Sequence, residues 1–232
     1  MFAISKKSPS GLKKRNKQLN IKPMADEVLQ TKIIKSATSQ FQKHGCKRIT
    51  MDYLAADLHI SKRTLYEIFA AKEDLLLACF KHLLELAEER RVFFEKENKT
   101  PITMVLYLFK GLAHFYKRYA LMIEDTQRYY PEVYGQVFPH NEGEWAMKVK
   151  ATLQEADRQG LLRSNADIES ATAVMAHFLD KVSDTSTNAP TMATIGEAGY
   201  TFMRGLLSVE AIAQFDTQEQ RIRDLINHAE IN

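Results

Sequence analysis

The apolar residues of this chain recur at helical spacing along most of its length. Near the start of the periodic region, four of them lie at every fourth position: Leu29, Ile33, Ala37 and Phe41. This spacing predicts an amphipathic helix, and Gly45, which follows a basic last turn, is typical of a helix end. We therefore expect a first helix over residues 26–44.

Two shorter helices are expected next, on either side of a tight turn at residues 59–60. Thr50 can cap the first of the two, which presents an apolar stripe: Met51, Leu54, Ala55 and Leu58. Ser61 can cap the second, and its inward residues are Leu65, Ile68 and Phe69. Two short helices joined by a turn of a few residues form a helix-turn-helix.

The rest of the chain predicts helices only. A long helix is expected over residues 72–98, before Pro101, and the later segments show helical periodicity without strand alternation. These segments span residues 102–119, 121–130, 142–160, 167–183, 192–207 and 217–227. The predicted fold class is all-α, with an N-terminal three-helix helix-turn-helix domain joined by a long helix to a larger C-terminal helical domain.

Charge is divided unevenly between the two ends of the chain. The net charge is +3, but residues 1–82 hold sixteen Lys or Arg against seven Asp or Glu, while the remainder holds sixteen against twenty-two. The N-terminal excess favours a polyanionic partner, although a solvated face or a membrane-surface patch would carry the same charge. Residues 1–25 are basic with almost no apolar periodicity, so we expect a disordered arm that is either inert or adds phosphate contacts.

Composition and motifs argue against several other classes of protein. No apolar run approaches the ~18 residues that span a bilayer, and no apolar stretch follows the basic start as in a secretory signal. We therefore expect a cytoplasmic protein that does not cross a membrane. Cys46 and Cys79 lie in no CxxC or Cys/His cluster, so both are expected in the core rather than in a disulfide or metal site. Nucleotide-binding, nucleophile-elbow and zinc-protease motifs are absent, and we expect neither an enzyme nor a cofactor.

One group of residues between positions 26 and 83 has the spacing of a known domain. It consists of Thr50, Leu54-Ala55, Leu58 to Ser61, Thr64 to Tyr66, Phe69 and Lys72 to Leu75, preceded by Ile33-Ile34, Ala37, Phe41 and Gly45. This pattern resembles the DNA-binding domain of the TetR family of one-component bacterial regulators. The resemblance implies a homodimeric transcription regulator, usually a repressor, that binds a palindromic double-stranded DNA operator and responds to a small-molecule effector.

The resemblance also divides the chain and assigns roles to side chains. It implies a basic arm (1–25), a DNA-binding domain (26–83) and a helical ligand-binding and dimerisation domain (84–232). The positions that commonly hold phosphates are matched by Thr50, Tyr66 and Lys72. The base-reading face is matched by Lys62, Arg63 and Thr64, with Ser61 beside them. Hydroxyl and Lys donors fix the register on phosphates, and Arg can bind guanine bidentately. A purely structural role is also open for four of these residues: capping for Thr50 and Ser61, packing for Tyr66, and a solvated charge for Lys72.

Three residues depart from the pattern of the family. His59 stands at the turn position usually held by Gly, and it tolerates a left-handed backbone only at some cost. Ala71 replaces the usual Ser or Asn cap of the long helix, which forgoes about 1 kcal/mol of capping. Arg63 replaces a commonly small residue, so the operator sequence is expected to differ from those of relatives.

The C-terminal domain carries enough aromatic and polar side chains to line an effector cavity. The candidate ligand-binding residues are Tyr107, His114, Phe115, Tyr130, Trp145 and His177. Arg128 and His177 are the candidate anchors for an anionic effector, and an ordinary helical core is the alternative interpretation of the whole set.

Small residues in the C-terminal helices indicate a candidate dimer face. They are Ala193, Gly196, Ala198, Gly199 and Gly205, and side chains of this size allow close helix approach. Another class of function remains open: a helical protein-interaction module with a basic N-terminus would bind DNA without sequence preference.

Overall fold

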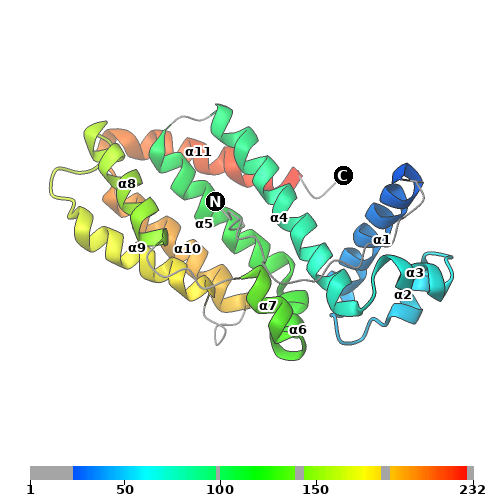
Figure 1. The fold of residues 1–232 in the computed structure, drawn as a ribbon. Helices are drawn as coiled ribbons and strands as arrows, with labels where there is room; N and C mark the ends of the chain where they lie inside the picture. Colours follow the sequence, from blue (N-terminus) through cyan, green and yellow to red (C-terminus); the bar gives the residue numbers. More distant parts are fainter. Residues whose placement is uncertain (1–22, 98–99, 139–143, 184–188, 229–232) are drawn as a thin grey trace, which may run out of the picture.

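The computed structural model describes residues 23–97, 100–138, 144–183 and 189–228, and it confirms the all-α fold class (Figure 1). The helices in these ranges are α1 (Pro23–His44), α2 (Met51–Asp57), α3 (Lys62–Ile68), α4 (Lys72–Glu97), α5 (Pro101–Arg118), α6 (Ala120–Tyr129), α7 (Pro131–Val137), α8 (Glu144–Arg158), α9 (Ile168–Ser183), α10 (Ala189–Leu206) and α11 (Val209–His228). Helices α1 to α3 lie at one end of the molecule, and α4 runs from them along the C-terminal helices. No helix in the described ranges is long and apolar enough to cross a membrane.

Helix α1 begins earlier than the sequence pattern indicated and ends where it was expected. It starts at Pro23, so the last three residues assigned to the basic arm are helical, and residues 1–22 lie outside the described part. Proline suits a first helical turn because its missing N–H would have no helical acceptor there. At the other end, the Gly45 N–H donates to the Phe41 carbonyl (2.9 Å) with φ at +81°, which confirms the glycine helix end.

The caps predicted for α2 and α3 are confirmed. The Thr50 hydroxyl oxygen accepts from the Tyr53 N–H (3.1 Å), and the Ser61 hydroxyl oxygen accepts from the Thr64 N–H (3.0 Å). Each bond satisfies a backbone donor that has no acceptor within the first turn of its helix. Between the two helices His59 adopts the left-handed backbone with φ at 55°, as its position in the turn predicted.

Ala71 has no side-chain group that could cap α4, but one of the two hydrogen bonds of a capping box is present. The Ala71 N–H donates to the Asp74 carboxylate (3.0 Å), which is the backward-reaching half of a capping box. Further along the helix, Cys79 is fully buried, as is Cys46 after α1. Burial raises the pKa of both thiols to about 12, so both are inert core residues, as expected.

Two helices of the C-terminal domain differ from the sequence-based expectation. Helix α7 lies between the expected segments 121–130 and 142–160 and was not predicted. Pro131 occupies the first position of this helix, which buries Val133 and Val137. Helix α11 begins at Val209 rather than near residue 217. Asp216, just before the expected start, lies inside α11 and forms an ion pair with Arg204 (2.8 Å).

Helix α10 packs against α5 through a glycine. A Cβ atom on Gly199 would lie 2.3 Å from Cδ1 of Phe109 in α5, so the absence of a side chain lets the two helices approach. Gly199 therefore serves packing within one chain, and its expected place in a dimer face is wrong. Gly205, in the last turn of α10, has no atom within 4 Å of such a Cβ.

These two glycines form a matched pair for a stability test. Gly199→Ala should lower the free energy of unfolding by about 1–3 kcal/mol, because the methyl group overpacks the α5 contact. Gly205→Ala should leave it unchanged or raise it by up to about 1 kcal/mol, because alanine favours the helix and meets no neighbour. Urea denaturation of both variants checks this, and equal effects at the two positions would contradict the packing described.

Candidate nucleic-acid interface

Helix α3 separates a buried face from a cationic face. Leu65 is fully buried, whereas the Arg63 side chain is 88% exposed on the other side of the helix. Lys62 and Tyr66 are also exposed, and no hydrogen bond or ion pair within the described residues occupies the Tyr66 hydroxyl. The structure thus brings these sequence-predicted residues to one solvent-facing surface, and the alternative of a packed Tyr66 does not hold.

The two polar residues at the start of α3 are held locally. The Thr64 hydroxyl is 2.8 Å from the Ser61 hydroxyl, and Thr64 is only half exposed. Thr50 is exposed at the start of α2 while its oxygen caps that helix. Capping and phosphate binding are compatible for Thr50, because an oxygen that accepts from a backbone N–H can still donate its own proton. One of the Ser61 and Thr64 hydroxyls donates to the other, so this pair has one proton left for a phosphate.

Both cations of the exposed face are paired with carboxylates that the sequence analysis did not single out. Lys62 Nζ lies 2.5 Å from Asp52 Oδ2, and Arg63 Nε lies 2.8 Å from Glu67 Oε1. Ion pairs this exposed contribute little to stability, so the cations can exchange these partners for DNA. The i,i+4 spacing of the second pair was a usable signal in the sequence, whereas the Lys62 pair joins two helices and was not.

Lys72 points away from the exposed face. Its ammonium donates to the Cys46 carbonyl and lies 5.4 Å from the ring centroid of Tyr130 and 5.9 Å from that of Phe41. These partners come from both sides of the junction between the helix-turn-helix and the C-terminal helices. Lys72 is therefore not a simple solvated charge. To contact a phosphate as well, its ammonium would have to donate a proton that these partners do not use.

The segment that follows α1 docks against α6. The Lys47 N–H donates to Asp125 Oδ2 (2.9 Å), and the Lys47 ammonium donates to the Tyr129 hydroxyl (3.2 Å). A Cβ on Gly45 would lie 2.4 Å from the same Asp125 oxygen, so only glycine permits this approach. The buried Cys46 thiol completes the contact, 3.5 Å from the Met122 carbonyl. We call residues 45–47 and their α6 partners the α6 junction.

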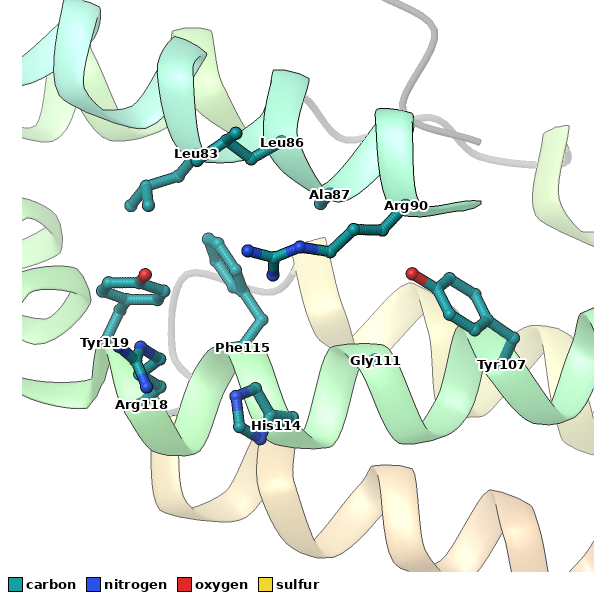
Figure 2. Close-up of a pocket in the computed structure, with 10 residues that line it drawn as sticks. All are labelled: Leu83, Leu86, Ala87, Arg90, Tyr107, Gly111, His114, Phe115, Arg118 and Tyr119. Carbon is teal, nitrogen blue, oxygen red and sulfur yellow. The ribbon is translucent and has the colours of Figure 1, made fainter. Parts of the chain in front are cut away.

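A pocket with a cavity volume of about 80 Å³ lies between α4 and α5 (Figure 2). It is lined by Leu83, Leu86, Ala87, Arg90, Tyr107, Gly111, His114, Phe115, Arg118 and Tyr119. Three of the predicted ligand-binding residues, Tyr107, His114 and Phe115, are therefore brought together. Arg90 and Arg118 were missed, because helical periodicity places a charge on a face without showing that a second helix closes over it.

The other predicted ligand-binding residues lie elsewhere. Tyr130 ends α6 beneath the Lys72 ammonium, and Arg128 is exposed on α6. His177 is exposed on α9. Trp145 belongs to α8, but its side chain is outside the part of the chain that the structure describes. Tyr130, Arg128 and His177 do not line the pocket between α4 and α5.

Comparison with known proteins gives a family match for this helix-turn-helix. Residues 33–79, from α1 into α4, match the family model described as bacterial regulatory proteins of the tetR family. Over these residues the chain is similar to the TetR family. Among curated proteins, no sequence matches the chain.

Solved structures share the TetR-like fold along most of the chain. A gamma-butyrolactone receptor (ArpA-like protein) is 21% identical with a TM-score of 0.58, over 86% of this chain and 98% of that one. CprB from Streptomyces coelicolor, solved in complex with its biological operator sequence, is 22% identical with a TM-score of 0.56, over 85% and 97%. A putative transcriptional regulator from Saccharomonospora viridis in complex with choline is 16% identical with a TM-score of 0.53, over 87% and 97%.

Arg63 and Lys72 should affect DNA binding differently. Arg63→Ala should cost about 1–3 kcal/mol on a preferred sequence and relax one base position, because an exposed guanidinium is removed from the reading face. Lys72→Ala should weaken all DNA sequences alike, and it should also lower the free energy of unfolding by about 1 kcal/mol, because the Cys46 carbonyl loses its donor.

Binding titrations on preferred and scrambled DNA across a salt series, with parallel urea denaturation, check both variants. The orientation of α3 described above would be contradicted by a loss of base preference in Lys72→Ala together with a sequence-independent loss in Arg63→Ala.

Proposed function

We propose that the chain is a ligand-responsive transcriptional repressor that binds a palindromic operator as a homodimer. The observation that carries this proposal is the course of α4. The helix begins at Lys72, beside the helix-turn-helix, and Leu83, Leu86, Ala87 and Arg90 further along it line the pocket. A molecule in the pocket therefore contacts the same rigid element that supports the recognition helix.

Dimerisation follows from the size of the reading surface. One recognition helix reads too few base pairs for useful specificity, and two helices about 34 Å apart read successive major grooves of a palindrome. Some of the exposed residues of α9 and α10 are small or apolar and support the packing of a second copy: Ala173, Val174, Ala198 and Thr201. A two-fold axis would bring each face against its own counterpart.

Regulation would operate through α4 and the α6 junction together. An effector shifts the equilibrium only if it binds the DNA-incompetent arrangement more tightly than the competent one. A displaced α4 would carry the helix-turn-helix with it, while the bond from the Lys47 N–H to Asp125 ties the same domain to α6. The operator complex of CprB and the choline complex of the Saccharomonospora protein support a DNA partner and a small-molecule effector for this fold.

Selection of binding sequences from a random DNA pool tests the proposal. The wild-type chain should enrich a palindrome whose half-sites are about one helical turn apart, bound by two chains. Analytical ultracentrifugation of the complex gives that stoichiometry. A pool without any enriched sequence would overturn the proposal and favour a protein-interaction module with a basic end.

The α6 junction gives a second expected outcome. Asp125→Ala should speed hydrogen exchange at the Lys47 amide and weaken operator binding several-fold, because the helix-turn-helix is then held less firmly at the spacing of the grooves. Glu132→Ala is the matched control, since it removes an exposed carboxylate from α7, outside the junction. Equal operator affinities for the two variants would show that the junction does not position the DNA-binding domain.

A further inference from the structure

We propose that the pocket between α4 and α5 binds an amphipathic anion, a small carboxylate whose apolar body is aromatic or aliphatic, with Arg90 as its anchor. The inference rests on the proposed function, because it names the chemical class of the effector. It is carried by three features of the pocket: the charge of its lining, the lack of a carboxylate partner for Arg90, and a gap in the row of side chains on α5.

The lining of the pocket is cationic and neutral, and none of its ten residues is acidic. Arg90 approaches from α4 and Arg118 from α5, with His114 and the hydroxyls of Tyr107 and Tyr119 as further polar groups. Burial raises the pKa of Tyr107, so its hydroxyl keeps its proton and can donate. A lining of hydrogen-bond donors without a carboxylate favours an anion over a cation.

Arg90 is placed to meet an anion from outside the chain. Its neighbours three and four positions away on α4 are apolar: Leu86, Ala87, Phe93 and Phe94. The nearby carboxylates of Glu88 and Glu95 are both held by Arg91, at 2.8 and 2.7 Å. Within the described residues, no hydrogen bond or ion pair joins Arg90 to a carboxylate. Figure 2 shows its side chain extending from α4 into the space above α5.

A missing side chain on α5 leaves room for the apolar body of the ligand. Tyr107, Gly111 and Phe115 follow one another at intervals of four residues, so they lie on one face of the helix. The two rings flank the pocket, and a Cβ on Gly111 between them would have no atom within 4 Å. Tyr107 is held in place by stacking on Phe94, with ring centroids 4.8 Å apart. An apolar group in this gap would lie between the two rings, with Ala87 and the Arg90 side chain of α4 above it.

An anion bound in this way would link the two helices. A carboxylate can accept two parallel hydrogen bonds from one guanidinium, which fixes it to α4, while its apolar body packs on α5. Because the pocket is partly enclosed by apolar side chains, the charge-assisted bonds are stronger than they would be in water. The ligand therefore couples the position of α4 to that of α5, which is the motion that the proposed regulation requires.

Calorimetric titration of the full chain with benzoate and with benzamide tests the inference. The two compounds have nearly the same shape, but only benzoate is charged. Benzoate should bind about tenfold or more tightly than benzamide, which is the usual range for hydrogen bonds to a charged group. Arg90→Gln should reduce benzoate binding to the level of benzamide, and Arg90→Lys should restore part of it. Gly111→Leu should block both compounds by filling the gap.

Lys117→Gln is the matched control, because it removes the same charge from an exposed position on α5 that does not line the pocket. Hexanoate, an aliphatic carboxylate, is titrated in parallel. Equal binding of benzoate and benzamide, equal losses in Arg90→Gln and Lys117→Gln, or no binding of either benzoate or hexanoate would overturn the inference. The proposed function is tested separately. It fails if no operator is enriched, or if bound benzoate leaves operator affinity unchanged, and neither result alters the calorimetric comparison.

Discussion

The hydrogen bond from the Lys47 N–H to the Asp125 carboxylate joins the segment after α1 to α6, where the two parts of this molecule meet. The bond depends on Gly45, because any side chain there would strike the carboxylate that accepts it. Lys72 adds a second tie across the same junction, between the Cys46 carbonyl and the Tyr130 ring. Contacts with α6 therefore contribute to the direction in which α3 presents its cations, together with the contacts of α1 with α4.

The helix-turn-helix could be predicted from the sequence because its determinants are local. Thr50 and Ser61 each accept a hydrogen bond from the N–H three residues further along the chain. His59 and Gly45 stand at turns whose left-handed backbone depends on a short segment. Helix-helix packing is not local in this way. Gly199 was expected at a dimer face because the pattern of small residues shows that a close approach occurs but not which helix approaches.

In the candidate sites too, local features could be predicted from the sequence, whereas features that depend on packing between helices could not. The exposed cations of α3 follow from helical periodicity, but their pairing with Asp52 and Glu67 and the inward orientation of Lys72 depend on the folded arrangement. In the pocket, Tyr107, His114 and Phe115 were predicted because aromatic and polar residues at helical spacing stand out in a sequence. Arg90 was not predicted, because its role depends on α5 lying across from it and on Arg91 pairing with the neighbouring carboxylates.

We propose that α4 transmits the occupancy of the pocket to the recognition helices. The distance between the two α1 helices of the proposed dimer tests this most directly. A spin label on Lys43→Cys, an exposed position of α1, should react selectively, because the thiols of Cys46 and Cys79 are fully buried. Pulsed electron resonance then gives the distance between labels with operator and with saturating benzoate. Transmission through α4 predicts that benzoate moves the distance distribution away from the operator-bound one. If the two distributions coincide while calorimetry shows the pocket to be occupied, α4 does not transmit the signal.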